Sequence, residues 1–217
     1  ERWHAVTGHP VIEGYGLSET SAAITWNRLD GANPVGSIGM AVGEVEISLR
    51  DEEGRPVEIG ELGELCARGP QMTTGYWNRP EENRQAFFEG AWFRTGDLAR
   101  VDEQGDYFIL DRRKDMILVS GFNVFPNEIE DVAGMHPGVL EAAAVGIAAD
   151  RTGEAVRLVV VRRDPALSED ELRAHCRRNL TGYKQPKIIE FRDSLPKSAV
   201  GKILRRELRQ PSANCIE

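Results

Sequence analysis

The stretch DRRKDMILVSGFNVFPNEIE, residues 111–130, lies between two parts of the chain that have different sequence patterns. Its first five residues are all charged, and we place a domain boundary within residues 111–114. A Ser-Gly-Phe bend around Gly121 follows, and Pro126 suits the first turn of a helix. The local sequence alone favours a charged surface turn, so the boundary depends on the patterns on either side.

Before this stretch, residues 36–111 alternate between apolar and polar side chains. Val45, Ile47 and Leu49 point to one side of a predicted strand, and DEEGRP follows as a turn. The runs GELCARG and LARVDEQGDYFILDR repeat the alternation around glycine-containing turns. This part is predicted to be mostly antiparallel β-structure.

After this stretch, the pattern is mixed. Ile129, Val132 and Ala133 have helical spacing, whereas VLEAAAVGIA and RLVVVRR indicate buried strands. Ser168 and Glu171 form a capping box that predicts the start of a second helix. The apolar face of that helix consists of Leu172, Cys176 and Leu180. The whole chain is therefore predicted to have an α+β fold.

The composition excludes several classes of protein. The chain has 217 residues, 41% of them hydrophobic, and a net charge of −8. No apolar run approaches the ~20 residues of a membrane span, and no secretory leader opens the chain. The three cysteines (Cys66, Cys176 and Cys215) and four histidines lack the spacing of a zinc site or a disulfide framework. Because the chain begins inside an apparent element, we expect it to be a fragment.

Positive charge is concentrated near the end of the chain. Residues 184–209 contain eight basic and three acidic side chains. Nucleic-acid binding is not predicted, because aromatic residues do not alternate with these cations and the whole chain is acidic. A phosphorylated small molecule is a better match for this stretch.

Three motifs contain residues suited to nucleotide chemistry. EGYGLSET, residues 13–20, has glycines that allow close approach of a ligand, an aromatic ring at Tyr15, and a hydroxyl and a carboxylate suited to phosphate and Mg²⁺. FRTGDLA, residues 93–99, contains Asp97, which could accept two ribose hydroxyls. LPKSAVGKILRREL, residues 195–208, contains Lys202 directly after a glycine. Each motif alone is more typical of an ordinary turn or a solvated lysine.

The order of these motifs resembles the adenylate-forming ligase superfamily, and within it the long-chain fatty-acyl-CoA synthetases. The blocks that carry the resemblance are EGYGLSE, GELCARGPQMTTGYWNRPE, WFRTGDLARVDEQGDYFILDRRKDMILVSGFNVFPNEIEDV and PKSAVGKILRREL. They cover this chain almost completely but match only the C-terminal two-fifths or so of such an enzyme. The phosphate loop and most of the large N-terminal domain are absent from this sequence, so this piece alone is expected to be inactive.

The resemblance implies two domains. Residues 1–112 would form the end of the large AMP-binding domain, a distorted and mostly antiparallel β-barrel. Residues 113–217 would form the small, mobile, mixed α/β C-terminal domain. Lys114 matches the hinge position, and Gly121 matches the glycine that borders the thiol tunnel.

The resemblance also implies the roles of the nucleotide-site residues. Tyr15, followed by Gly16, would stack on adenine, and Ser18, where threonine is usual, would contact phosphate. Asp97 and Arg112 would take the ribose hydroxyls. Glu19, which would hold Mg²⁺, and Lys202, the adenylation lysine, are the expected catalytic residues.

The implied reaction joins a fatty acid to coenzyme A through an acyl-adenylate made from ATP. Two anions must meet in its first step, and at ~4 Å they repel by ~4 kcal/mol at an effective dielectric near 20. Lys202 would remove that repulsion and then leave as the C-terminal domain turns. The alternatives are another acyl- or aryl-CoA ligase, a peptide-synthetase adenylation domain, a luciferase-like enzyme, or a non-catalytic interaction module.

A cytoplasmic location is expected. Peripheral contact of residues 184–209 with the inner face of the membrane, a homodimer of the parent protein, and the preferred acyl chain length are left open.

Overall fold

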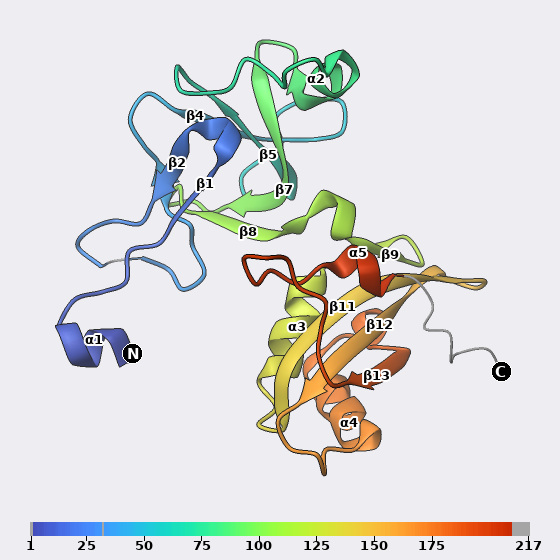
Figure 1. Ribbon diagram of the computed structural model, residues 1–217. Helices are drawn as coiled ribbons and strands as arrows, with labels where there is room; N and C mark the ends of the chain where they lie inside the picture. The colour runs from blue at the N-terminus through green and yellow to red at the C-terminus, as the bar shows by residue number, and fades with distance from the viewer. Residues whose placement is uncertain (1, 32, 210–217) are drawn as a thin grey trace. The chain divides into compact units, whose positions relative to one another are not determined.

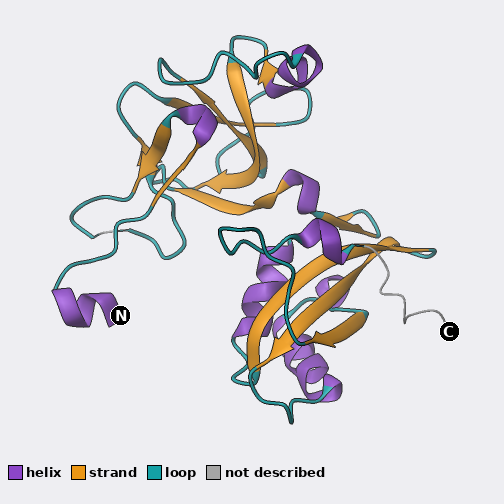
Figure 2. Ribbon diagram, viewed as in Figure 1, coloured by secondary structure: helices purple, strands orange, loops and turns teal. Residues whose placement is uncertain are grey.

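The computed structural model describes residues 2–31 and 33–209, and the chain divides into two compact units (Figure 1). The first unit comprises Glu1–Arg113 and the second comprises Lys114–Glu217. Helices and mostly antiparallel strands occur in both, so the predicted α+β fold is confirmed (Figure 2). The division falls within the charged stretch that follows Leu110.

The first unit contains two antiparallel sheets. After helix α1 (Arg2–Thr7), one sheet has the order β1-β2-β3, with β1 at Gly14–Leu17, β2 at Ala22–Trp26 and β3 at Met40–Ala41. The other has the order β4-β5-β7-β6, and β8 also pairs with β7. Its strands are β4 (Glu46–Arg50), β5 (Gly63–Arg68), β6 (Phe87–Phe88), β7 (Trp92–Val101) and β8 (Tyr107–Arg112). The predicted β-structure of residues 36–111 is thereby confirmed.

The core of the first unit joins its two sheets. Ile24 of β2 packs in one cluster with Leu49 of β4, Leu65 of β5 and Ala99 of β7. Strand β5 lies between β4 and β7, and its first five residues are all buried. Its side chains are therefore covered on both faces of the sheet, whichever way they point.

One helix of the first unit was not predicted. Helix α2 spans Pro80–Ala86, with a proline in its first turn followed by Glu81 and Glu82. A proline followed by acidic residues is a recognised helix-start signal. The segment was missed because it has no apolar periodicity, and accordingly none of its residues is buried.

The second unit is built on one five-stranded mixed sheet. The order is β10-β9-β12-β11, and β13 pairs with β12 in parallel. The strands are β9 (Ile117–Val119), β10 (Phe122–Val124), β11 (Val139–Ala149), β12 (Gly153–Arg162) and β13 (Ile188–Arg192). The helices are α3 (Pro126–Gly134), α4 (Glu169–Asn179) and α5 (Arg205–Leu208). Both predicted helices and both predicted buried strands are confirmed.

The two faces of this sheet are covered differently. Alternate residues of β12, such as Leu158 and Val160, pack with α3 and α4 in one core cluster. Their neighbours Val159 and Val161 face the other side, where Leu195 and Leu208 cover them. The terminal segment that contains Lys202 is thus held against the sheet by apolar residues on both sides of the lysine.

Within the described residues the longest helix is α4, with 11 residues, and no helix has both the length and the hydropathy of a bilayer span.

Candidate functional site

Three of the predicted nucleotide-site residues lie together in the first unit. Tyr15 is on β1, Asp97 on β7 and Arg112 at the end of β8, where it is the register partner of Asp97. The Tyr15 hydroxyl donates to Oδ2 of Asp97 at 2.5 Å, and Nε of Arg112 lies 3.6 Å from Oδ1. Asp97 is nearly buried, whereas the Arg112 side chain is 51% exposed. A tyrosine, a carboxylate and a guanidinium therefore meet in the first unit.

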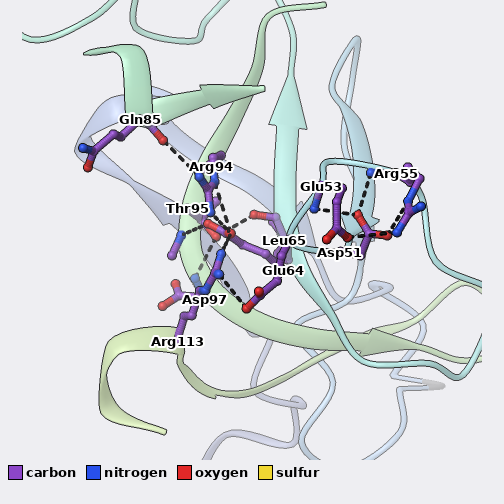
Figure 3. A network of polar contacts seen from close by, with 12 residues as sticks. Asp51, Glu53, Arg55, Glu64, Leu65, Gln85, Arg94, Thr95, Asp97 and Arg113 are labelled. Carbon is purple, nitrogen blue, oxygen red and sulfur yellow. Dashed lines mark hydrogen bonds and ion pairs between the residues drawn. The ribbon is translucent and has the colours of Figure 1, made fainter. Parts of the chain in front are cut away.

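The register of β7 against β5 shifts just before Asp97, and local polar groups hold this irregular stretch of the strand. Gly96 has a φ of +76°, a conformation that favours glycine. The Asp97 amide donates to Oγ1 of Thr95 at 3.1 Å, and that hydroxyl donates to the carbonyl oxygen of Leu65 at 2.7 Å. Figure 3 shows Thr95 beside Leu65, and this contact ties the stretch before Asp97 to β5.

The protonation of Tyr15 follows from its surroundings. Burial raises the pKa of the Tyr15 hydroxyl well above its ordinary value, and the charge and hydrogen bond of Asp97 raise it further. Tyr15 therefore remains a neutral hydrogen-bond donor at physiological pH.

Ser18 and Glu19 lie on a short 3₁₀ turn, Ser18–Thr20, directly after β1. Thr20 is buried and holds the turn through its hydroxyl, which donates to the carbonyl oxygen of Ala22 at 2.7 Å and accepts from the Leu17 amide at 2.9 Å. Ser18 is exposed. Oε1 of Glu19 accepts a hydrogen bond from the Tyr76 hydroxyl at 2.8 Å.

Tyr76 is a site residue that the sequence did not indicate. It lies in the GYWN sequence that precedes α2, 57 residues after Glu19. Partial burial raises the pKa of its hydroxyl, and the Glu19 carboxylate raises it further. Its position beside Glu19 depends on the fold, although GYWN belongs to a block on which the resemblance rests.

A magnesium ion bound with a nucleotide is compatible with this turn. In residues 2–31 and 33–209, no group of three or more potential ligands among His, Cys, Asp and Glu is close enough to form a metal site. Mg²⁺ at phosphate-transfer sites often takes one or two protein carboxylates and completes its shell with phosphate oxygens and water. A single carboxylate at Glu19 fits that mode of binding.

Gly16 has a packing role that does not require a ligand. A Cβ atom at this position would lie 2.1 Å from the carbonyl oxygen of Ala22 on β2. The close pairing of β1 with β2 therefore excludes any side chain here, whatever the residue contributes to binding.

Gly121 lies in the second unit at a two-residue turn between β9 and β10. Ser120 and Gly121 both have positive φ, at +51° and +84°, as a tight hairpin of type I′ requires. Apart from Gly121 and its two neighbours in the chain, no heavy atom lies within 4 Å of the position that a Gly121 Cβ would occupy. The ring of Phe122, which is 55% exposed, stacks on Tyr183 with centroids 4.7 Å apart.

Lys202 lies on a compact loop of the second unit. Lys197 and Ile203 form an isolated β-bridge across the loop base, and the Ser198 amide donates to the carbonyl oxygen of Lys202 at 2.8 Å. The Lys202 amide in turn donates to the Ser198 hydroxyl at 3.2 Å, and Gly201 has a φ of +80°. The lysine is exposed, and its ammonium has no partner among the described residues. A fixed backbone thus presents an unpaired cation.

Lys114 lies on the 3₁₀ turn Arg113–Asp115, at the division between the two units. None of the three residues of this turn is buried. The predicted hinge residue is therefore the first residue of the second unit.

The cysteines form no functional group in the described part of the chain. Cys66 and Cys176 are buried free thiols, one in each unit, and Cys215 lies outside the described residues. Burial raises the pKa of both thiols, to about 12 for Cys66.

The amino-acid sequence is similar to those of known proteins along most of its length. Residues 1–77 match the family described as AMP-binding enzyme, and residues 128–202 match the AMP-binding enzyme C-terminal domain. A long-chain-fatty-acid–CoA ligase of Yersinia pestis is 54% identical over 96% of this chain and 37% of its own length. One of Escherichia coli O157:H7 is 52% identical over the whole chain and 38% of its own length.

A solved structure gives the same result for the fold. The ATP-bound MatB of Rhodopseudomonas palustris is 37% identical and superposes with a TM-score of 0.88, covering 95% of this chain and 41% of that protein. This chain spans well under half the length of these relatives. With both of the family's matching regions in the expected order, the chain belongs to the AMP-binding enzyme family.

Proposed function

We propose that the protein containing this chain activates long-chain fatty acids with ATP, forming an acyl-adenylate and pyrophosphate, and then transfers the acyl group to coenzyme A. The observation that carries this proposal is the meeting of Tyr15, Asp97 and Arg112 in a chain whose curated relatives are long-chain-fatty-acid–CoA ligases. ATP and coenzyme A are substrates in this proposal.

In the proposed site, the first unit holds the nucleoside. The Tyr15 ring offers a flat surface for adenine, and Asp97 and Arg112 offer an acceptor and donors for the two ribose hydroxyls. The hydrogen bond from Tyr15 fixes Asp97 before any ligand binds. Such preorganisation reduces the entropy cost of binding.

The phosphates would lie near the turn after β1. The exposed hydroxyl of Ser18 can donate to a phosphate oxygen, and Glu19 would supply a carboxylate to Mg²⁺. When bound, the metal would neutralise charge on the phosphates. Tyr76 orients the Glu19 carboxylate through its hydrogen bond.

Lys202 would act in the first step. The fatty-acid carboxylate and the α-phosphate are both anionic, and a lysine ammonium between them stabilises the charge that develops in the transition state. Support comes from the exposed, unpaired side chain on a loop that is itself well ordered by hydrogen bonds. Because its cation has no partner in the described part of its own unit, it is available for delivery to a nucleotide.

The second step would need Lys202 to leave. We propose that the second unit turns about Lys114 and brings the Gly121 turn beside the path of the coenzyme A thiol. This role is supported by the open space beside Gly121. A side chain at this position would project into that space, where the thiol is proposed to pass.

A cytoplasmic location is part of this proposal, but membrane contact through residues 184–209 has little support. Five of the eight cations in that stretch pair with carboxylates of the same unit. They are Lys184, Arg192, Lys197, Arg205 and Arg209. We do not extend the proposal to a homodimer.

The deciding experiment uses the full-length protein that contains this chain. Pyrophosphate release is measured with ATP, Mg²⁺ and a panel of long-chain fatty acids, aromatic acids and amino acids, and thioester formation is then measured with coenzyme A. Release that depends on fatty acid, followed by acyl-CoA, is the expected result. A preference for aromatic or amino acids would favour another branch of the family, and no turnover with any acid would favour a non-catalytic module.

A further inference from the structure

The residue before Lys114 is fastened to the first unit. Nη1 of Arg113 donates to Oε2 of Glu64 at 3.0 Å, and Nη2 donates to Glu52 at 2.8 Å. Glu64 lies on β5 and its side chain is only 4% exposed. It also accepts a hydrogen bond from Arg94, which Figure 3 shows beside it, and another from the Gly96 amide. Removing Arg113 from a carboxylate this deeply buried would be costly.

The residue after Lys114 is fastened to the second unit. Nη2 of Arg209 donates to Oδ1 of Asp115 at 3.0 Å, and Nη1 of Arg205 lies 3.7 Å from Oδ2. The Asp115 side chain is 14% exposed. Nη2 of Arg209 also donates to the carbonyl oxygen of Lys114 itself, at 2.6 Å. The peptide plane between Lys114 and Asp115 is therefore tied to the second unit.

Both arginines belong to the segment that carries Lys202. Arg205 is the first residue of α5 and Arg209 follows its end, while Leu208 between them is completely buried against the sheet. Arg205 also forms ion-pair hydrogen bonds with Glu130 of α3, at 2.9 and 2.7 Å. Helix α5 is thus a fixed point that joins α3, the turn at Asp115 and the loop of Lys202.

From these contacts we propose that Glu64 and Asp115 are positioning residues, which confine rotation between the units to Lys114 and make the Lys202 segment move as one body with Asp115. This rests on the proposed function for its catalytic consequence, but the clamps themselves do not. Arg113 is held on one side of Lys114, and the Lys114 carbonyl is held on the other. The backbone torsions that remain free to rotate between them are φ and ψ of Lys114. Because ion pairs hold Asp115 to the segment that carries Lys202, a rotation at Lys114 moves Lys202 together with Asp115.

The clamps are tested first in the 217-residue chain by hydrogen–deuterium exchange. Arg209→Gln and Asp115→Asn should raise exchange at amides 114–118 by about tenfold, the effect expected from losing a charge-assisted hydrogen bond. Arg206→Gln is the matched control, because Arg206 lies on the same helix and has no side-chain partner among the described residues. In the double variant Arg209→Gln/Asp115→Asn, the increase in exchange should be smaller than the sum of the two single increases, because both substitutions remove the same ion pair.

The clamp of the first unit is tested in the same way. Glu64→Gln should raise exchange at residues 111–114, and Glu103→Gln, an exposed glutamate of the same unit, should not. In all variants, exchange in the long paired strands β11 and β12 should stay unchanged. Increased exchange throughout either unit would show a merely structural role, and unchanged exchange at the turn would show that no clamp exists. Either result overturns the proposal.

The catalytic consequence is tested in the full-length protein. Arg209→Gln should lower kcat for adenylation at least about tenfold with little change in the KM for ATP, because the nucleotide would be held by the other unit. Adenylation at the rate of the wild type would overturn the positioning role. A wild-type protein that adenylates no acid would instead refute the proposed function, and the exchange results would still decide whether the clamps exist.

Discussion

The hydroxyl of Tyr15 donates a hydrogen bond to Oδ2 of Asp97, although 82 residues separate the two in the chain. The contact joins β1 of the three-stranded sheet to β7 of the five-stranded sheet. It therefore links the ring proposed to stack on adenine to the carboxylate proposed to bind ribose. Disturbing either residue is expected to disturb the other.

Tyr15→Phe should distinguish the contribution of the Tyr15 ring from that of its hydroxyl. The ring remains, but Asp97 loses a donor to a nearly buried oxygen, which should destabilise the first unit by about 1–3 kcal/mol and weaken ATP binding. Stability is measured by urea unfolding with tryptophan fluorescence, which reports this unit because it contains all four tryptophans, Trp3, Trp26, Trp77 and Trp92.

Tyr107→Phe provides the matched control for Tyr15→Phe. Tyr107 is a half-buried tyrosine of the same unit, and its hydroxyl has no hydrogen-bond partner among the described residues. Equal loss of stability and equal ATP affinity in the two variants would contradict the role given to the Tyr15–Asp97 hydrogen bond.

Local patterns predicted the longest elements of the fold, which are β7, β11, β12, α3 and α4. The spacing of Ile129, Val132 and Ala133 predicted α3, and Ser168 caps α4 by accepting from the Glu171 amide at 3.2 Å, as expected. The pattern failed at α2, which buries no residue and so shows no apolar period. A helix that buries no side chain has no apolar periodicity, so the sequence indicates it only through the residues at its ends.

The candidate site was predictable as a set of residues but not as a set of contacts. Tyr15, Asp97 and Arg112 came from motifs, whereas their meeting depends on strand pairing between distant segments. Glu64 escaped notice because a charged residue in an alternating strand normally faces water. Its strand is central, so Arg94 and Arg113 cover the carboxylate instead of solvent.

The first unit should lose stability at alkaline pH through Cys66. Burial, and after it the nearby Glu64 charge, raises the pKa of this thiol from its ordinary value of 9.0 to about 12. Because the folded state holds the proton more tightly, the stabilisation is complete below pH 9 and is lost between about pH 9 and 12. The loss should approach about 1.4 kcal/mol per pH unit in that window.

Cys66→Ala should therefore flatten the fall in unfolding free energy between pH 8.5 and 10.5, measured by urea unfolding with tryptophan fluorescence. The fall should not vanish, because burial also raises the pKa of Tyr15 and Tyr107. Cys176→Ala is the control, since that thiol lies in the other unit. An unchanged slope in Cys66→Ala would refute this assignment.

Lys202→Ala should impair one of the two proposed half-reactions in the full-length protein and spare the other. Adenylation should fall by about 10²-fold or more, because the cation between carboxylate and phosphate is lost. Thioester formation from pre-made acyl-adenylate should be nearly unaffected. Pyrophosphate release and acyl-CoA formation are measured separately, with Lys187→Ala as the control because Lys187 is exposed in the same basic stretch. Equal loss of both steps would contradict the role of Lys202.

Lys114→Pro should impair the opposite step. Proline fixes φ near −65° and restricts the residue before it, so rotation at Lys114 is blocked. A protein fixed in the adenylating arrangement should release pyrophosphate but stall before acyl-CoA, and single-turnover measurement of both products would show this. Lys114→Ala removes the same side chain but leaves the backbone free, so it should retain both steps. Thioester synthesis at the normal rate in the proline variant would exclude Lys114 as the hinge, and loss of both steps in the alanine variant would assign the effect to the lysine side chain instead.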